Sequence, residues 1–235
     1  MLFDLDNTLY AYDPAHKAGM LAVYEKALRK IGIAPDEFKK AFDAARSEIK
    51  KQLGKTASSH SRLLYFQRTL EHLEFRSQIL LSLELEQTYW GNYLASSEVN
   101  PGVFEFLDQL ARANIPRVLV TDLTSQIQFR KLVYMDLDQR FEYVVTSEES
   151  GNDKPDPAGF DIALSKLGSS LPEEPTIWMI GDNVKSDIEG AKNGVNASTI
   201  ALKSALGEEG NNPSIDMTFD EFDDLEKFVA DKGWE

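Results

Sequence analysis

The first eight residues, Met1 to Thr8, contain the densest group of side chains that could do chemistry. Asp4 ends a short apolar run, and Asp6 and Thr8 follow at alternate positions. In an extended chain, residues two apart project to the same side, about 6.6 Å apart along the strand. Two carboxylates that converge at a strand end resist joint ionisation unless a cation or a proton lies between them. The pattern therefore predicts a Mg²⁺ site in which one carboxylate is free to act as a nucleophile.

Three further segments carry polar residues directly after short apolar runs. They are Thr121-Asp122, the loop with Lys154-Pro155, and Gly181-Asp182-Asn183, which is followed by Asp187. In open α/β sheets, ligands bind at the carboxyl ends of the strands. If these apolar runs are parallel strands of one sheet, all of these side chains meet Asp4 and Asp6 at one edge. Carboxylates, a hydroxyl and an ammonium would then be available together for a metal ion and a phosphate.

From residue 100 onward, helical and strand patterns alternate. This alternation predicts an α/β fold with a doubly wound, Rossmann-like parallel sheet covered by helices on both faces. The expected strands span 2–4, 117–121, 143–146, 176–180 and 198–202, with an edge strand at 215–219. The expected helices span 103–113, 125–134, 157–167, 186–193 and 220–230. Only three residues precede Asp4, so either pairing of the first strand begins at Met1 or the natural chain extends upstream.

Residues 14–99 have helical periodicity almost throughout. Four helices are expected, at 15–31, 35–53, 59–73 and 76–94, with no strand between them. Consecutive helices of this kind form a small bundle. The first strand has no partner in such a bundle, so the bundle is an insertion after that strand. The predicted domains are a core of 1–13 and 100–235 and a helical domain of 14–99.

Composition limits the classes of partner and the chemistry. The 235 residues carry a net charge of −14, which argues against a nucleic-acid polymer as partner because phosphate backbones require basic surfaces. No apolar run approaches the roughly 18 residues that span a bilayer. The absence of cysteine removes thiolate catalysis and Cys-zinc sites, and a cytoplasmic location fits best. The sequence leaves the oligomeric state open.

Taken in order, the four motifs resemble those of the haloacid dehalogenase-like hydrolase superfamily. They are Asp4-x-Asp6-x-Thr8, the threonine Thr121, the lysine of Lys154-Pro155-Asp156-Pro157, and Gly181-Asp182 with Asp187. The helical insertion lies where that superfamily carries a type C1 cap. The resemblance covers the whole core, and the order and spacing of four motifs make it specific.

The resemblance implies a role for each of these residues. Asp4 would attack phosphorus to form an aspartyl-phosphate, and Asp6 would serve as general acid and then as general base. Mg²⁺ would be held by Asp4, the backbone carbonyl of Asp6 and Asp182. The phosphoryl group would be bound by Thr121, Asp122 and Lys154, although Asp122 could instead cap the helix that follows it. Thr8, Asn183 and Asp187 would support these groups.

The implied activity is Mg²⁺-dependent hydrolysis of a phosphomonoester of a small metabolite, a nucleotide or a sugar phosphate. The stretch 120–131, with Gln128 and Lys131, is similar to the group holding pyrimidine 5′-nucleotidases and N-acylneuraminate-9-phosphate phosphatases. Substrate choice would rest with the cap. Arg62 could reach an anionic substrate group, or it could be a solvated surface side chain. Tyr10 could line the entrance, or it could pack between the core and the cap.

Three other activities fit parts of this pattern. A phosphomutase or phosphotransferase of the same superfamily would use the same residues for transfer instead of hydrolysis. A response-regulator receiver also combines a phosphoacceptor Asp with acidic Mg²⁺ ligands, but its acidic pair lies on another strand and it lacks a helical insertion. A dehalogenase is disfavoured because those that the chain resembles lack the carboxylate found here at Asp6.

Overall fold

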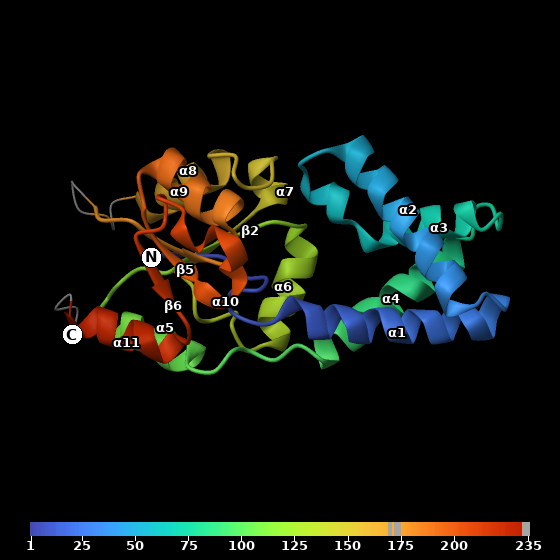
Figure 1. The fold of residues 1–235 in the computed structure, drawn as a ribbon, viewed down its shortest axis with the longest axis horizontal. Helices are drawn as coiled ribbons and strands as arrows, with labels where there is room; N and C mark the ends of the chain where they lie inside the picture. Colours follow the sequence, from blue (N-terminus) through green and yellow to red (C-terminus); the bar gives the residue numbers. More distant parts are fainter. Residues whose placement is uncertain (169–170, 172–174, 232–235) are drawn as a thin grey trace. The chain divides into compact units, whose positions relative to one another are not determined.

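The computed structural model of the chain describes residues 1–168, 171 and 175–231 (Figure 1). The chain forms two compact units. The core unit consists of Met1–Ala11 together with the chain from Glu98 onward, and the helical unit is Tyr12–Ser97. The helical unit therefore lies between the first and second strands of the core unit in the sequence.

The core unit is built on a six-stranded sheet of order β3-β2-β1-β4-β5-β6. The strands are β1 (Leu2–Phe3), β2 (Val118–Thr121), β3 (Tyr143–Thr146), β4 (Trp178–Gly181), β5 (Ser198–Leu202) and β6 (Met217–Phe219). All neighbouring strands pair in parallel. The short β1 lies between β2 and β4, and its pairing extends to Met1, whose carbonyl accepts from the Val118 N–H at 2.9 Å. The predicted doubly wound α/β fold is confirmed.

Side chains of β1 alternate between the two faces of the sheet. Leu2 belongs to an apolar cluster with Phe160 of α8 (Ala158–Leu167) and Ala191 of α9 (Gly190–Val195) on one face. Phe3 packs edge-on against Phe106 of α5 (Val103–Arg112), with ring centroids 6.2 Å apart, on the other. This alternation follows from the two-residue period of a strand, and it lets one short strand anchor both helical layers.

Close to the predicted positions lie the core helices α5 (Val103–Arg112), α6 (Ser125–Tyr134), α8 (Ala158–Leu167) and α11 (Phe222–Asp231). No helix was predicted at the positions of the short α7 (Ser147–Ser150) and α10 (Lys203–Leu206) or of the 3₁₀ turn η4 (Gly207–Asn211). Helix α9 (Gly190–Val195) follows β4. The main difference lies after β4. The single helix expected at 186–193 is a π-helical turn, η3 (Val184–Glu189), followed by α9.

The helical unit contains α1 (Tyr12–Ile31), α2 (Pro35–Leu53), a 3₁₀ turn η1 (Ala57–His60), α3 (Arg62–His72) and α4 (Ile79–Ala95). Helix α1 begins three residues earlier than predicted. Pro14 lies in its first turn, where a backbone N–H has no helical partner to lose. Aromatic rings of Phe38, Phe42, Phe66 and Tyr89 form the centre of the bundle. No helix within the described ranges is long and apolar enough to cross a bilayer.

Candidate active site

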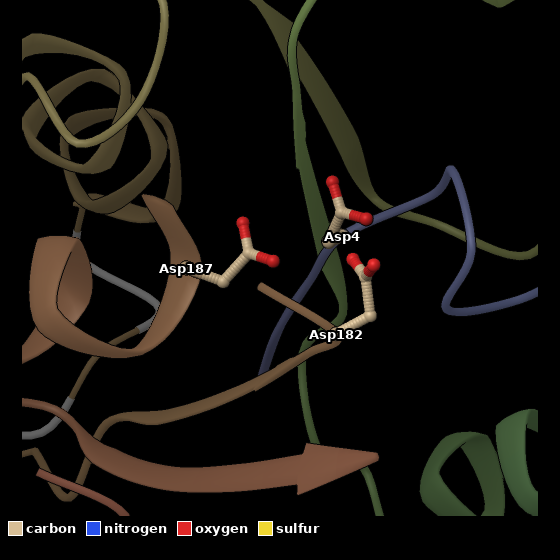
Figure 2. A group of neighbouring side chains, drawn as sticks. All are labelled: Asp4, Asp182 and Asp187. Carbon is tan, nitrogen blue, oxygen red and sulfur yellow. The ribbon is translucent and has the colours of Figure 1, made fainter. Parts of the chain in front are cut away.

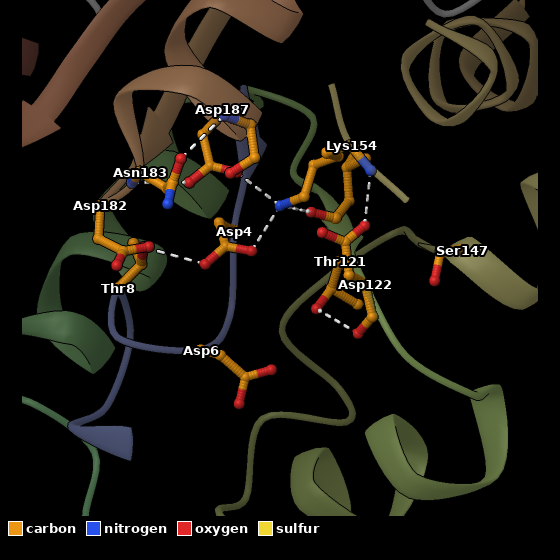
Figure 3. A network of polar contacts seen from close by, with 12 residues as sticks. Asp4, Asp6, Thr8, Thr121, Asp122, Ser147, Lys154, Asp182, Asn183 and Asp187 are labelled. Atoms are coloured by element: carbon orange, nitrogen blue, oxygen red, sulfur yellow. Dashed lines mark hydrogen bonds and ion pairs between the residues drawn. The ribbon is translucent and has the colours of Figure 1, made fainter. Parts of the chain in front are cut away.

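The carboxyl ends of the central strands bring the predicted residues together (Figure 3). Asp4 directly follows β1 and keeps one ladder bond, from its N–H to the Ile180 carbonyl at 2.9 Å. Thr121 is the last residue of β2, and Asp182 directly follows β4. Lys154 reaches the same edge from the loop after α7. Residues that are far apart in the sequence thus share one site because parallel strands end at one edge.

Lys154 is the cationic centre of the site. Its Nζ donates to Asp4 Oδ1 at 2.6 Å, to Asp187 Oδ1 at 2.7 Å and to the Val120 carbonyl at 2.9 Å. Burial opposes the charged ammonium, but the charges of Asp187 and Asp4 outweigh it, and the pKa of Lys154 is raised well above its usual value. The lysine therefore stays cationic throughout the physiological pH range.

Asp4 follows β1, whereas Asp182 and Asp187 both come from the stretch after β4, and the three carboxylates converge (Figure 2). One oxygen of each lies within 4.8 Å of the others. Burial raises the pKa of Asp4, and the charges of Asp187 and Asp182 add to this against the opposing charge of Lys154. Burial and the charge of Asp187 raise the pKa of Asp182 to about 7. An oxygen-only donor set of two buried acids and the half-buried Asp182, which repel one another, fits a hard divalent cation such as Mg²⁺.

Thr8 and Asn183 support this acid cluster in different ways. The Thr8 hydroxyl donates to Asp4 Oδ2 at 3.2 Å, so it orients that carboxylate. The Asn183 side chain caps η3 instead, accepting from the N–H groups of Lys185 at 3.1 Å and Ser186 at 2.9 Å. Its backbone N–H donates to Asp187 Oδ2 at 3.0 Å, which fixes the second oxygen of that buried acid.

Asp6 faces a different set of partners from Asp4 although only Leu5 separates them. Its Oδ1 accepts from Lys131 Nζ at 2.6 Å and from the Tyr10 hydroxyl, and its Oδ2 accepts from Gln128 Nε2 at 3.0 Å. Burial by itself would raise the pKa of Asp6. The charge of Lys131 and the three hydrogen bonds outweigh burial, so the pKa is lowered.

Thr121 and Asp122 extend the site toward α6. The Thr121 hydroxyl oxygen lies 2.6 Å from Gln128 Nε2. Asp122 does not cap the following helix, as one prediction had it, because its Oδ1 accepts from the Lys154 N–H at 2.9 Å. The N-cap position of α6 is Thr124 instead. Asp122 thus ties the loop that carries Lys154 to the end of β2.

The two predicted substrate residues are both buried. Tyr10 belongs to the core unit, is fully buried, and donates to Asp6. Arg62 belongs to the helical unit and is only 7% exposed, so the alternative of a solvated side chain is wrong. Its guanidinium lies over the rings of Tyr89 and Tyr65, at 5.2 Å and 5.4 Å from their centroids, and donates to the Tyr12 hydroxyl at 2.7 Å.

Two residues of this site had no predicted role. Gln128 and Lys131 lie on α6 and contact Asp6, and the sequence indicated them only as part of a stretch similar to one group of hydrolases. A signal was present in the spacing. Both are polar and three residues apart, next to the apolar positions Ile127 and Leu132 that are buried in α6.

Fold and site together define an α/β protein with a carboxylate cluster and a buried lysine at the carboxyl edge of a parallel sheet. Residues 1–194 match the sequence model of the haloacid dehalogenase-like hydrolases. The chain belongs to this family and is an enzyme of the hydrolase class. The predicted family membership is therefore confirmed.

Three known proteins illustrate the similarity. A ribulose-1,5-bisphosphate 5-phosphatase of Halopiger xanaduensis is 38% identical over 202 residues, which cover 85% of this chain and 82% of that protein. A glyceraldehyde 3-phosphate phosphatase of Pyrococcus furiosus is 28% identical over 227 residues, covering 95% of this chain and 86% of that protein. The crystal structure of a phosphatase of this family from Thermococcus onnurineus superposes with a TM-score of 0.74 at 26% identity, covering 97% of this chain and 96% of that chain.

Proposed function

We propose that the chain is a Mg²⁺-dependent phosphatase that hydrolyses the phosphomonoester of a small phosphorylated metabolite. The observation that carries the proposal is the buried contact of Lys154 with both Asp4 and Asp187, beside Asp182. A phosphoryl group brings two negative charges to a reaction that needs mainly positioning and neutralisation. The ammonium of Lys154 lies on one side of the Asp4 carboxylate and the cation-binding acid cluster on the other. Together they can position the phosphoryl group and neutralise its charge.

Asp4 is the proposed nucleophile. One of its carboxylate oxygens forms a bond to phosphorus while the bond from phosphorus to the ester oxygen breaks, and an aspartyl-phosphate results. Water then attacks this phosphorus, the bond to Asp4 breaks, and inorganic phosphate leaves with the carboxylate restored. The Thr8 hydroxyl and the Lys154 ammonium hold the two oxygens of Asp4 and so orient it for attack. Covalent catalysis of this kind divides one difficult step into two easier ones.

Asp6 is the proposed general acid and base. Because the contacts of Asp6 lower its pKa, its carboxylate must first take up a proton, and this proton passes to the leaving alkoxide oxygen as the ester bond breaks. In the second step the resulting carboxylate takes a proton from the attacking water and returns to its first state. Such transfers contribute about 10²–10⁴-fold to rate. Lys154 and the Thr121 hydroxyl bind the non-bridging phosphoryl oxygens.

The residues present fit a Mg²⁺ ion. Asp4, Asp182 and the backbone carbonyl of Asp6 would hold it, and Asp187 would steady this group and Lys154. When bound, the ion supplies positive charge that stabilises the phosphoryl oxygens in the transition state. The oxygen-only donor set distinguishes this site from zinc sites, which are built from nitrogen and sulfur ligands as well.

The proposed substrate class is a phosphorylated sugar or triose. This choice rests on the relatives, which are named for ribulose 1,5-bisphosphate and glyceraldehyde 3-phosphate. The helical unit would act as the cap that selects the substrate, with Arg62 as its candidate for an anionic group. A cytoplasmic location remains a prediction from the sequence.

Phosphate release from a panel of phosphorylated metabolites, with Mg²⁺ and with EDTA, tests the proposal. Ribulose 1,5-bisphosphate, glyceraldehyde 3-phosphate and pyrimidine nucleotides belong in the panel. We expect Mg²⁺-dependent release from at least one sugar phosphate, and loss of release in Asp4→Asn with the fold intact. Full activity of that variant would contradict the nucleophile. Release from no compound, with transfer of phosphate between sugars, would favour a phosphomutase.

A further inference from the structure

Helix α6 buries two polar residues for which the proposed mechanism has no role so far. Gln128 and Lys131 are three residues apart, so they share one face of the helix. They are 0% and 2% exposed. Burying a lysine costs desolvation free energy unless the lysine is paired and hydrogen-bonded. An apolar residue at this position would avoid that cost. The pair therefore calls for a functional explanation.

Gln128 and Lys131 hold Asp6 by opposite oxygens. Lys131 Nζ donates to Oδ1 at 2.6 Å, and Gln128 Nε2 donates to Oδ2 at 3.0 Å. A carboxylate anchored on both oxygens cannot rotate about its terminal torsion without breaking one of the two bonds. The direction in which Asp6 presents its oxygens is thus set by α6 together with Tyr10 of the loop that carries Asp6.

Gln128 also determines which way the Thr121 hydroxyl can point. Its Nε2 also lies 2.7 Å from the Asp122 carbonyl and 2.6 Å from Thr121 Oγ1, so its two hydrogens are shared among three acceptors. A carbonyl can only accept, so the nitrogen and not the oxygen of the Gln128 amide faces this group. An amide nitrogen does not accept hydrogen bonds, so the Thr121 hydrogen must point elsewhere. The Thr121 hydroxyl instead donates to the Asp122 carbonyl over a long contact of 3.5 Å, which donation to a phosphoryl oxygen can replace.

From these contacts we infer that Gln128 and Lys131 are positioning residues of the active site. Lys131, with Gln128, fixes Asp6 for proton transfer to the leaving oxygen. Gln128 keeps the Thr121 hydroxyl as a donor to the phosphoryl group. Neither residue touches the substrate, and each acts through Asp6 or Thr121. This inference rests on the proposed phosphatase function.

Leaving-group dependence tests the role of Lys131. An alkoxide leaving from glyceraldehyde 3-phosphate needs a proton, whereas p-nitrophenolate leaves readily without one. In Lys131→Met we expect kcat/KM to fall about 10²-fold on glyceraldehyde 3-phosphate and less than about 3-fold on p-nitrophenyl phosphate. Lys166→Met is the matched control, because Lys166 is a half-buried lysine of α8 that donates to the Val144 carbonyl and to Glu149. Equal losses on both esters would overturn this role.

Binding of inorganic phosphate tests the role of Gln128 without turnover. Gln128→Glu keeps the shape but offers an acceptor, which would draw the Thr121 hydrogen away from the phosphate. We expect the Kd to rise about 10-fold more in Gln128→Glu than in Gln128→Leu. In a Thr121→Val background the difference between the two substitutions should shrink to the part that the charge of Glu causes by itself, since coupling between residues in contact disappears when one is removed. A difference of the same size in both backgrounds would overturn the role.

The two measurements separate failure of this inference from failure of the proposed function. If the wild-type protein releases phosphate from no compound of the panel, the phosphatase function fails, and the phosphate-binding cycle still decides whether Gln128 directs Thr121. The opposite case begins with a wild-type protein that hydrolyses both esters. If kcat/KM of Lys131→Met then falls equally on the two esters and the phosphate-binding cycle shows no coupling, the phosphatase function stands and the inference fails. Cooperative thermal unfolding of every variant confirms that losses do not come from misfolding.

Discussion

Lys154 Nζ lies 2.6 Å from Oδ1 of Asp4, although 150 residues separate the two in the sequence. Both side chains are less than one-tenth exposed, and the same ammonium contacts Asp187 at 2.7 Å. The contact joins the end of the first strand to the loop after α7. It is therefore both a link between distant segments and the electrostatic centre of the proposed active site.

Replacing Lys154 with Met should damage stability and activity together. Removal of the ammonium leaves the buried carboxylates of Asp4 and Asp187 without their positively charged partner. This loss lowers the free energy of unfolding by about 3–5 kcal/mol. Loss of a charge that neutralises the phosphoryl oxygens should lower kcat about 10²–10³-fold. Urea unfolding without added metal and steady-state kinetics measure the two effects.

Lys192→Met is the control for this substitution. Lys192 also pairs with an aspartate, Asp216, at 2.9 Å, but the side chains of this pair are 32% and 41% exposed. Its loss should cost about 1 kcal/mol or less and leave kcat unchanged. If Lys154→Met and Lys192→Met lost the same stability, burial would not be what makes the Lys154 contact important.

Binding of Mg²⁺ should strengthen as pH rises from 6 to 8. The pKa of Asp182 is raised to about 7, chiefly by burial and by the charge of Asp187. A metal ligand must be deprotonated, so binding below pH 7 releases a proton. The Kd for Mg²⁺ should fall up to about tenfold for each pH unit over which one proton is released. Calorimetry between pH 6 and 8 measures this, and a Kd that stays constant would contradict the assignment.

Stability of the metal-free protein should change with pH in the opposite direction. Because the pKa of Asp182 is raised on folding from 3.8 to about 7, the folded state binds more protons than the unfolded state between these values. The stabilisation that comes from the raised pKa of Asp182 is fully present below about pH 4 and is lost as pH rises through 7. In EDTA, the Tm of Asp182→Asn should therefore fall less between pH 5 and 8 than the Tm of the wild type. An identical decline in the two proteins would count against this explanation.

Local pattern was enough to predict the sheet and the segments that carry the site. The strand at 198–202 and the helix at 125–134 have the predicted bounds in the structure. Both signals are short-range, since an apolar run or a helical period depends only on nearby residues. The rule that ligands bind at the carboxyl ends of parallel strands then located Asp4, Lys154 and Asp182 at one edge.

What the sequence did not reveal depends on contacts between distant segments. Arg62 is buried because Tyr12 of α1 and Tyr89 of α4 surround it, and nothing in its local sequence indicates those neighbours. Likewise, Gln128 and Lys131 have a visible spacing, but their partner Asp6 lies more than a hundred residues earlier. The roles of the site residues remain predictions for the experiments described here.

Adding a methyl group at Gly181 should disturb the acid cluster. A Cβ built there would lie 2.5 Å from Asp187 Cβ and 2.6 Å from Asp187 Oδ2, closer than side-chain carbons approach. Gly181→Ala must therefore displace Asp187 and, through it, Lys154. A shift of about 1 Å can cost about 10²-fold in activity, and we expect that loss in kcat/KM.

Gly91→Ala provides the control for added volume. Nothing lies within 4 Å of a Cβ at this position in α4, so the substitution meets no clash. Alanine in place of glycine within an exposed helix should stabilise the protein by about 1 kcal/mol without affecting kcat/KM. Wild-type activity in Gly181→Ala would mean that the position of Asp187 is unimportant for turnover.

The stability lost on replacing Arg62 should depend on how well the new side chain packs against the surrounding rings. Its guanidinium lies 5.2 Å from the Tyr89 centroid and 5.8 Å from that of Trp90. Arg62→Lys keeps a buried charge but loses the planar group that stacks on the rings and donates to Tyr12, so it should cost about 3 kcal/mol. Arg62→Met removes the charge and retains apolar contact with the rings, so it should cost less. Urea unfolding gives the order, with exposed Arg29→Met as the control.

If Arg62 instead serves mainly to bind an anionic substrate, the KM for ribulose 1,5-bisphosphate should rise more in Arg62→Met than in Arg62→Lys, the reverse of the order in stability.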